Sequence, residues 1–465
     1  MADTYISRAA TGSVTSDKTF TFSFWLKRGD LSRTQTVFMH ENASGHYEKF
    51  QLELQSDNTF RVSIYDGSSE FNYDTNMVFL DTSSWYNIVV RWDTTQSTST
   101  DRVRIYVNGS QITFDNANGS TATMPNQNFA INLGEKIMVW GRYQASSPGA
   151  YFSGSLSHCH YADGQSYAPT VFGSVDSTTG EWKLNTTPTV TYGNNGFFVL
   201  KDGNRVVNDA GNSSGNFAVG GGTLTKTEDC PSNNFPTFIT ASHSGSYTFY
   251  NGATTSFGNG TSDWSKATIG TLGASDGKYY WEIKLGMNGG ATDYNITGVV
   301  RSDKVFSNSN VYSNGGFNGL QSANAAGGLG IYSQTGASMG GALYIGGSSV
   351  NLTNGAIVMY ALDLDNKKMW VGKNGTWANA GSGGGVGNPA TGANPLWGTG
   401  EFTTGATYLP GNIQYQTSDC SYNFGNGYFK TTAVASAGTN ASGNGIFEYN
   451  VPSGFTALST KGLNL

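Results

Sequence analysis

Short runs in which apolar and polar residues alternate strictly are the feature that most constrains the fold of this chain. In KTFTFSFWLKRGD, residues 18–30, Phe20, Phe22 and Phe24 share one face, and Thr and Ser residues occupy the other. Successive side chains of a β-strand point to opposite faces, so this run predicts a strand with one face in a core. Further runs follow at the spacing of a β-sandwich: FQLELQSDNTFRVSIYDG, SWYNIVVRWD, DRVRIYVNGSQIT with its Asn108–Gly109 turn, GSLSHCHYADGQ and NGFFVLKDG.

The composition agrees with strands rather than helices. Only 12% of the residues are charged, whereas 13% are aromatic and 63 are glycine. The Glu, Lys and Arg residues that favour helices are therefore scarce, while Thr, Tyr, Phe, Trp and Val favour half-buried strands. We predict an all-β protein, and 465 residues are enough for more than one domain.

Several partners and compartments are disfavoured by the sequence. A net charge of −6 and a pI of about 5.4 give no basic surface for nucleic acid. The chain has no apolar stretch of about 18 residues, so we expect no membrane insertion, and its start, MADTYISRAATG, does not resemble a secretion signal. The cysteines at 159, 230 and 420 are distant and odd in number, which is consistent with assembly in a reducing cytosol rather than with a disulfide framework.

The first half of the chain carries a specific resemblance. The order of FTFSFWLKR, WYNIVVRWD, RVRIYVNG and FSGSLSHCHYADGQSYAPTVFG, followed by GEWKLN and YGNNGFFVLKDG, resembles the concanavalin A-like, or laminin-G-like, domain of many bacteriophage virion proteins. The resemblance covers residues 1–203 and implies a two-sheet jelly roll.

The rest of the chain divides into three predicted parts. Residues 204–237 are rich in Gly, Asn and Ser, as in a linker, and resemble the connector that follows such domains in phage proteins. Residues 238–428, with GKYYWEIKLG, ITGVVRSD, GGLGIY, TYLPGNIQY and DCSYNFG in this order, resemble the SPRY domain, a second β-sandwich used for recognition. Residues 429–465 resemble the short C-terminal segment that follows this pair, and the alternation over residues 446–449 suggests an added strand.

The stretch GAIVMYALDLDNKKMWVGKNGTW, residues 355–377, allows two interpretations. Its Asp-x-Asp could serve a metal or sugar-processing site, or the stretch could form a hairpin of a sheet. A turn at Asp365–Asn366 would place Asp363 opposite Lys368, a pair that contributes about 0.2–1 kcal/mol. The local supply of Lys rather than oxygen ligands favours the hairpin without a metal.

The sequence gives little indication of a hydrolytic or metal-binding site. No Glu-x-Asp-x-x-Glu run of the laminarinase type occurs, although carboxylates from distant strands could still form a hydrolytic pair. His158 and His160 share one face of a predicted strand, where a structural role is favoured over a metal site. Asp101 and Asp115 are candidates by type for a rim Ca²⁺, but they cannot be aligned to the family's ligands. We therefore predict no metal and no other cofactor.

Three aromatic residues fall in loops rich in Gly, Asn and Ser. They are Tyr312, Phe317 and Trp397, and an exposed ring at such a place could stack on a sugar or anchor a protein partner. We take these three as the predicted ligand-binding residues.

Together, the resemblances imply a non-enzymatic virion protein of a tailed bacteriophage. We expect a tail or capsid fibre or spike, assembled in the host cytoplasm, that presents loops to a host-surface glycan or protein. Its partners would be other virion proteins and further copies of itself, a trimer by analogy. The alternatives are a capsid decoration or fibre-base protein without receptor binding and, third, a glycan-degrading enzyme.

Overall fold

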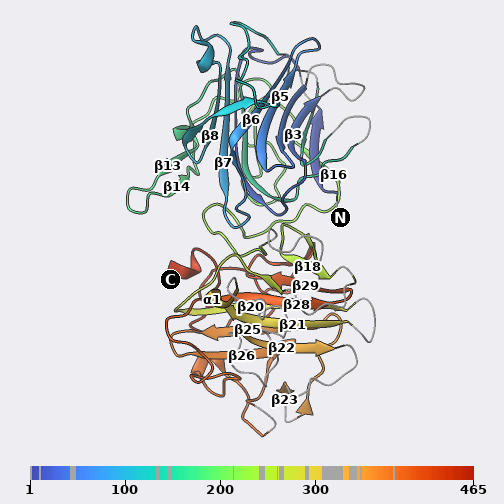
Figure 1. Cartoon of the computed structure of the whole chain (residues 1–465), viewed down its shortest axis with the longest axis vertical. Helices are drawn as coiled ribbons and strands as arrows, with labels where there is room; N and C mark the ends of the chain where they lie inside the picture. The colour runs from blue at the N-terminus through green and yellow to red at the C-terminus, as the bar shows by residue number, and fades with distance from the viewer. Residues whose placement is uncertain are drawn as a thin grey trace. The chain divides into compact units, whose positions relative to one another are not determined.

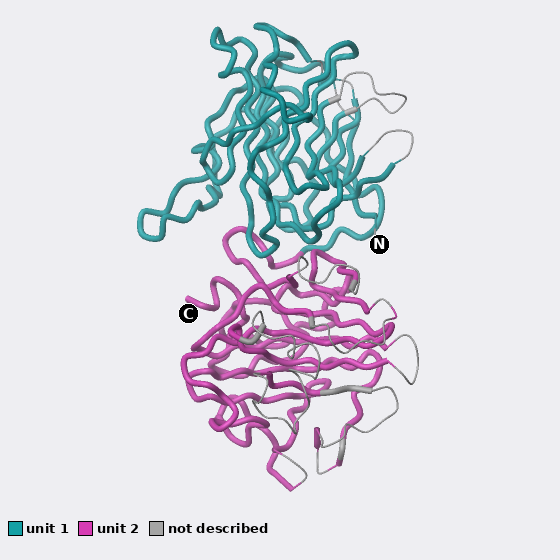
Figure 2. The backbone as a smooth tube through the Cα atoms, in the orientation of Figure 1, with its two compact units in different colours: residues 1–226 teal, residues 227–465 magenta. Residues whose placement is uncertain are grey.

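The computed structural model of this chain divides into two compact units, residues 1–226 (unit 1) and 227–465 (unit 2), shown in Figures 1 and 2. The structure describes residues 3–9, 12–41, 49–131, 133–134, 136–143, 148–212, 214–239, 247–258, 260, 267–287, 293–305, 328–334, 343–345, 348–380 and 383–464. Within these ranges the only α-helix is the four-residue α1, Ser302–Val305, and no helix is long and apolar enough to cross a membrane. The all-β prediction is confirmed, and each unit is a β-sandwich.

Unit 1 contains two large antiparallel sheets. The eight-stranded sheet has the order β10 (Phe114–Asn116), β6 (Glu70–Val78), β5 (Thr59–Tyr65), β4 (Lys49–Leu54), β3 (Gln35–Glu41), β11 (Ile137–Trp140), β1 (Tyr5–Ala9) and β16 (Ala218–Gly221). The six-stranded sheet has the order β15 (Phe197–Val199), β12 (Gly154–Asp163), β2 (Thr19–Arg28), β7 (Tyr86–Asp93), β8 (Val103–Val107) and β9 (Ser110–Ile112). The hairpin of β13 (Gly173–Val175) and β14 (Trp182–Leu184) and the short 3-10 helices η1 (Ser99–Asp101) and η2 (Pro169–Val171) lie outside these sheets.

The core of unit 1 lies between the inner faces of its two sheets. Phe20, Phe22 and Phe24 of β2 are fully buried there, which confirms the inward face predicted from their alternation. Phe22 stacks on Phe50 of β4, in the opposite sheet, with ring centroids 4.8 Å apart. Aromatic pairs of this kind contribute about 0.5–1.5 kcal/mol beyond the burial of their area, so they help to fix how the two sheets pack.

The turn between β8 and β9 consists of Asn108 and Gly109, as predicted. Both residues have positive φ, 47° and 79°, as a type I′ turn requires. Asn108 Oδ1 accepts the backbone N–H of Asn87 at 2.8 Å, and the Trp182 indole N–H donates to Asn87 Oδ1 at 3.0 Å. The Trp182 ring lies so close that a Cβ on Gly109 would stand 2.4 Å from it. The turn and the β13–β14 hairpin are therefore packed together.

The two histidines of β12 do not follow the simple alternation expected for them. A bulge shifts the register between Ser157 and His160, and His158 has a φ of 47°. His158 Nδ1 lies 2.7 Å from Ser157 Oγ, and His160 stacks on Phe198 with ring centroids 3.9 Å apart. Burial lowers the pKa of both imidazoles, that of His158 to about 4, so both are neutral at pH 7.

Unit 2 also contains two main sheets. One has the order β17 (Tyr247–Tyr250), β18 (Thr255–Gly258), β29 (Ser418–Asn423), β20 (Lys278–Met287), β25 (Ile357–Asp363), β26 (Lys368–Lys373) and β27 (Thr376–Trp377), and β32 (Thr456–Ala457) also pairs with β20. The other has the order β19 (Ala267–Ile269), β28 (Tyr408–Tyr415), β21 (Tyr294–Arg301) and β22 (Gly328–Gln334). Smaller elements are β23 (Tyr344–Ile345), β24 (Ser348–Ser349), β30 (Tyr428–Phe429), β31 (Thr432–Ala433), η3 (Pro389–Thr391) and η4 (Gly462–Asn464).

The β25–β26 hairpin has the predicted register, with Asp363 opposite Lys368. Its electrostatics differ from the expectation, because the ion pair of Asp363 is made with Lys278 of β20 at 3.1 Å. Lys368 Nζ donates instead to the carbonyl of Gly392 at 2.8 Å. β25 lies between β20 and β26, so Asp363 has neighbours on two strands, and the hairpin sequence specifies only one of them.

The C-terminal segment packs on unit 2 through a buried carboxylate. Glu282 of β20 is fully buried, and its oxygens accept the backbone N–H groups of Glu448 and Tyr449 at 2.9 and 2.8 Å. The Tyr280 hydroxyl and Asn423 Nδ2 donate to the same carboxylate at 2.9 and 3.2 Å. Burial raises the pKa of Glu282 to about 7. The added strand expected at residues 446–449 is not formed, because two of these N–H groups bond to a side chain rather than to a strand.

The segment from 204 to 237 is shared between the two units. Residues of β16 pair with β1 in the eight-stranded sheet of unit 1. Phe235 is buried in the core of unit 2, and the carbonyl of Asn234 accepts the N–H of Thr460 at 2.9 Å. The boundary between the compact units falls between Lys226 and Thr227, within the segment expected to be a linker.

Candidate functional site

The outer face of the eight-stranded sheet in unit 1 carries a connected set of polar contacts. In β4 and β5 every second residue points into the core, with Leu52 and Val62 as fully buried examples. Glu53 directly follows Leu52 and Arg61 directly precedes Val62, so both point to the opposite, outer face. Both side chains are partly exposed.

The register of the sheet aligns five polar residues in one line across it. Thr36 of β3 is opposite Glu53, Glu53 is opposite Arg61, Arg61 is opposite Asp74 of β6, and Asp74 is opposite Asp115 of β10. We call Glu53, Arg61, Asp74 and Asp115 the charged row. Directly opposite side chains in antiparallel strands are about 5 Å apart, so these groups act on one another.

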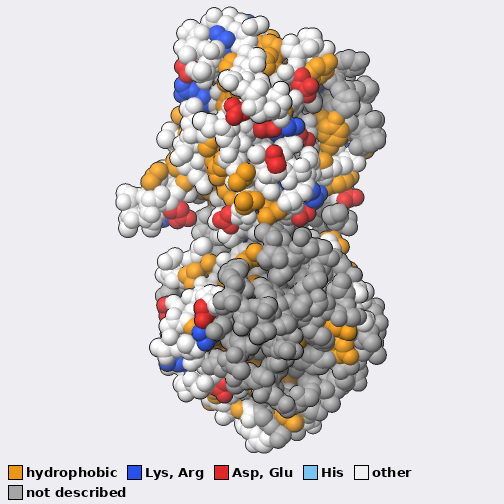
Figure 3. Space-filling view, in the orientation of Figure 1, with side chains coloured by type: hydrophobic (Ala, Val, Ile, Leu, Met, Phe, Trp, Pro, Cys, Tyr) orange, Lys and Arg blue, Asp and Glu red, His pale blue; other side chains and the backbone are white. Residues whose placement is uncertain are grey.

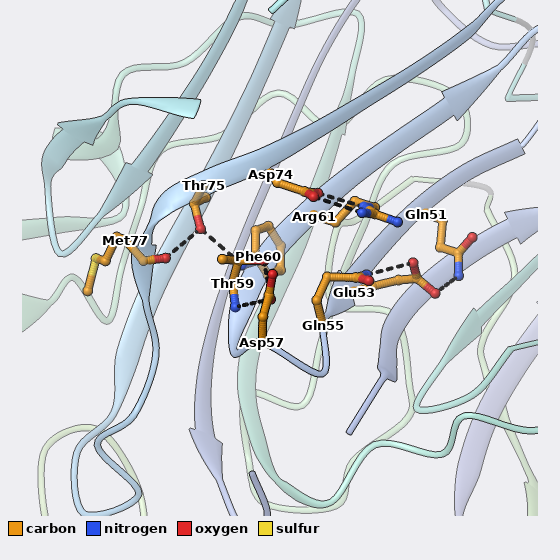
Figure 4. A network of polar contacts seen from close by, with 10 residues as sticks. All are labelled: Gln51, Glu53, Gln55, Asp57, Thr59, Phe60, Arg61, Asp74, Thr75 and Met77. Atoms are coloured by element: carbon orange, nitrogen blue, oxygen red, sulfur yellow. Dashed lines mark hydrogen bonds and ion pairs between the residues drawn. The ribbon is translucent and has the colours of Figure 1, made fainter. Parts of the chain in front are cut away.

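Arg61 and Asp74 form the strongest contact in the charged row. Nε and Nη2 of Arg61 donate to the two carboxylate oxygens of Asp74 at 2.6 and 2.7 Å, a bidentate pair drawn in Figure 4. The hydrogen bonds to Asp74 raise the pKa of the Arg61 guanidinium above its usual range. The two side chains remain 24% and 17% exposed, so a ligand on this face can reach them.

Glu53 is held by amide and hydroxyl donors on its own side of the sheet. Its Oε1 accepts hydrogen bonds from Gln51 Nε2 and, at 3.2 Å, from Thr36 Oγ1. Gln55 Nε2 donates to Oε2 at 3.1 Å, so both carboxylate oxygens are oriented by neutral side chains (Figure 4). The face is thus pre-organised before any ligand binds.

A turn and a bulge beside the charged row fix its geometry. The β4–β5 turn is closed by Asp57, whose Oδ1 accepts the N–H and the hydroxyl of Thr59 at 3.0 and 2.7 Å. The register then shifts between Thr59 and Arg61, and the Thr75 hydroxyl accepts the Phe60 N–H at 3.0 Å (Figure 4). Bulges of this kind redirect the side chains beside them.

The outer face of the six-stranded sheet is occupied by the chain itself. Val89 of β7 and Tyr106 of β8 form a small cluster with Phe172, and Tyr167, Val171 and Val190 pack against it. That face is therefore covered by the segment that follows β12, and of the two sheets the eight-stranded one offers the charged row to solvent. Figure 3 shows acidic side chains spread over the visible face of unit 1.

The predicted ligand-binding residues do not form this site. Tyr312 and Phe317 lie outside the described residues. Trp397 is 4% exposed and belongs to the core of unit 2, and its backbone pairs with Met369 of β26 at 3.0 and 3.2 Å. The expected exposed ring is thus a core residue, because an adjacent strand end holds the Gly-rich loop against the sheet.

The acidic residues considered for a rim cation have other neighbours. Asp101 pairs with Arg104 through a hydrogen bond between their side chains, and Asp115 lies in the charged row. Among the described residues no group of three or more His, Cys, Asp or Glu side chains is arranged to hold a metal ion.

The charged row is not predicted from the sequence, although the sequence pattern indicates the orientation of two of its residues. The alternation in FQLELQ and FRVSIY places Glu53 and Arg61 on a polar face. The partner of Arg61 could not be found in the same way, because the bulge between β5 and β6 changes which residues are opposite.

Comparison with known proteins supports the fold of unit 1. The family model of the concanavalin A-like lectin/glucanases superfamily matches residues 1–163, which end with the last residue of β12. No curated protein matches the chain significantly.

Solved structures show distant similarity to this chain. A heptameric SAP-like pentraxin from Limulus polyphemus is 15% identical over 36% of this chain and 71% of its own, with a TM-score of 0.26. The TRIM65 PSpry domain is 12% identical over 41% of this chain and 92% of its own, with a TM-score of 0.26. Domains LG4-5 of the mouse laminin alpha1 chain are 9% identical over 90% of this chain and 84% of theirs, with a TM-score of 0.29.

Proposed function

We propose that this chain is a non-enzymatic surface component of a bacteriophage particle, a fibre or spike, whose unit 1 binds a host-surface glycan on the outer face of its eight-stranded sheet. The observation that carries this proposal is the charged row, held in place by Arg61, Asp74 and the donors around Glu53. The match of residues 1–163 to a superfamily of lectins and glucanases supports a carbohydrate ligand. The phage assignment rests on the resemblance of the sequence motifs to virion proteins.

The polar chemistry of the face suits sugar hydroxyl groups. A hydroxyl both donates and accepts, so it can bind a carboxylate oxygen of Glu53 and an amide of Gln55 at once. Two partly exposed residues extend the face beyond the charged row. Asn72 adds a polar amide, and Tyr65 adds a ring on which a sugar can stack. Sugar binding of this type is weak at one site and is strengthened when many copies act together on a particle.

Binding is favoured over hydrolysis by the way the carboxylates are held. Glycoside hydrolysis needs one carboxyl that gives a proton to the leaving group and a second that acts as a nucleophile or base. The acids of this face are Glu53, Asp74 and Asp115, and Arg61 stands between Glu53 and Asp74 in the register. Asp74, which lies next to Asp115, accepts the Nε and Nη2 donors of Arg61 with its two oxygens, so it is already committed to an ion pair.

A binding experiment with matched variants tests the proposal. The purified chain is applied to a glycan array, and the best ligand is titrated calorimetrically against the wild type, Arg61→Ala and Arg104→Ala. Arg104 also pairs with an aspartate in unit 1, at similar exposure, but away from the charged row. We expect Arg61→Ala to weaken binding at least tenfold and Arg104→Ala to leave it unchanged, with both variants folded by circular dichroism. Binding that is equal in all three, or no binding to any glycan, would overturn the proposal.

The place of the chain on a particle needs a separate measurement. A cryo-EM map of the intact particle that contains this chain would show whether the outer face of the eight-stranded sheet is open to solvent. Burial of this face against other virion proteins would make the chain a decoration or fibre-base component instead.

A further inference from the structure

We infer that the outer face of the eight-stranded sheet selects neutral, hydroxyl-rich glycans and rejects anionic ones such as sialylated or sulfated chains. This inference rests on the proposed function, because it names the ligand class of the same site. It follows from the balance and the pairing of the charges in the charged row.

The balance of charge in the row is negative. Glu53, Asp74 and Asp115 contribute three carboxylates and Arg61 one guanidinium, so the row carries a net charge of −3 + 1 = −2. Asp74 and Asp115 are direct cross-strand partners, which places two like charges side by side at one end of the row. An anionic sugar on this face would therefore meet repulsion from several carboxylates at short range.

The one guanidinium of the row is already engaged. Arginine recognises carboxylate and sulfate groups through two parallel N–H donors. In Arg61 Nε and Nη2 are both occupied by Asp74, at 2.6 and 2.7 Å. An anionic ligand could use only the remaining N–H groups, on Nη1 and Nη2, of a guanidinium whose charge Asp74 already balances. The row thus lacks a cation whose charge is not already balanced by a neighbouring carboxylate.

The same contacts leave the face able to bind neutral hydroxyl groups. The oxygens of Glu53 and Asp74 can accept additional hydrogen bonds, because each carboxylate oxygen accepts more than one. The donors that surround Glu53 are the amides of Gln51 and Gln55 and the hydroxyl of Thr36. A sugar hydroxyl can share such donors and acceptors without adding charge.

Pairs of glycans that differ only in charge give the direct test. The wild-type chain is titrated with a neutral oligosaccharide that it binds and with the sialylated and sulfated forms of the same oligosaccharide, in low salt and in 0.5 M NaCl. We expect the anionic forms to bind at least tenfold more weakly in low salt, and we expect added salt to reduce this difference because it screens the repulsion.

Two asparagine variants test the role of the Arg61 pair. Asp74→Asn removes one negative charge and releases the Arg61 guanidinium, so we expect the anionic forms to gain at least tenfold in affinity. The control, Asp101→Asn, releases Arg104 away from the row and should not change the preference.

The outcomes separate the two proposals. Anionic forms that bind as tightly as the neutral one, or a penalty that does not respond to salt, would overturn the charge selection while leaving glycan binding intact. An Asp74→Asn variant that gains no more than the control would also overturn it. Failure of the wild type to bind any glycan, neutral or anionic, would instead remove the proposed function itself.

Discussion

The ammonium group of Lys278 lies 3.1 Å from Oδ2 of Asp363, whose side chain is only 3% exposed. The two residues are register partners on β20 and β25. Asp363 also accepts the backbone N–H and Nδ2 of Asn366 in the following turn, both at 2.9 Å. A nearly buried carboxylate is therefore neutralised by a residue 85 positions earlier in the chain (363 − 278), and the turn that follows depends on it.

Loss of this ion pair should destabilise unit 2. Lys278→Met leaves Asp363 buried without its cation, and because Lys278 is 34% exposed we expect a moderate loss, about 1–2 kcal/mol in the free energy of unfolding. Lys368→Met is the matched control, since Lys368 faces Asp363 in the hairpin but donates to Gly392, and it should cost less. Urea denaturation in a double-mutant cycle measures both couplings. A larger coupling of Asp363 to Lys368 than to Lys278 would contradict the observed pairing.

Glu282 makes the stability of unit 2 depend on pH. Its pKa of about 7 in the folded chain exceeds the usual value near 4.5, so the folded state binds the proton more tightly. The stabilisation is complete below pH 4.5 and is lost as the pH rises through 7, by roughly 3 kcal/mol at most. Urea denaturation between pH 4.5 and 8 should show the wild type losing stability relative to Glu282→Gln, which cannot titrate. Parallel curves for the two proteins would show that Glu282 does not titrate in this range.

Two glycines in Asn-Gly turns give a matched test of packing in unit 1. Gly109 and Gly119 have similar positive φ values, 79° and 74°, but only a Cβ on Gly109 would meet a neighbour, the ring of Trp182. Gly119→Ala should cost about 1 kcal/mol from the backbone alone, and Gly109→Ala a further 1–3 kcal/mol from the displaced ring. Thermal unfolding of the two variants measures the difference. Equal losses would mean that Trp182 can move away without cost.

The three cysteines should differ sharply in reactivity. Cys159 and Cys420 are fully buried, and burial raises the pKa of both thiols, whereas Cys230 is partly exposed. Because the thiolate is the reactive form, a thiol reagent should modify one cysteine per native chain and all three after unfolding. Mass spectrometry of the labelled chain counts the adducts, and Cys230→Ser should show none in the native state. Fast labelling of Cys159 in the native chain would contradict its burial.

Features encoded within a short stretch could be predicted from the sequence. The alternation around Phe22 gave the inward face of β2, and Asn108–Gly109 gave both the position and the type of its turn. The register of the β25–β26 hairpin also followed from its turn. In each case the determining residues are neighbours in the chain, so local rules are sufficient.

Features that depend on strands brought together by the fold could not be predicted in this way. The pairing of Arg61 with Asp74 requires the bulge at Phe60, and the pairing of Asp363 with Lys278 requires β20 to lie beside β25. The loop composition, rich in Gly, Asn and Ser, predicts an exposed ring at Trp397, but the residue pairs with Met369 and is buried. The composition of a loop predicts that its backbone is irregular, but it does not predict whether neighbouring segments bury its side chains.

The way the strands of the two units are ordered along the chain also sets when each can fold during synthesis. The sheets of unit 1 are complete once β16, Ala218–Gly221, has left the ribosome and paired with β1. In unit 2, two of the hydrogen bonds to Glu282 come from the N–H groups of Glu448 and Tyr449. The pairing of β20 with β32 likewise needs residues near 456. Unit 1 can therefore fold while unit 2 is still being translated, whereas the carboxylate of Glu282 lacks two of its hydrogen-bond donors until Glu448 and Tyr449 have been added.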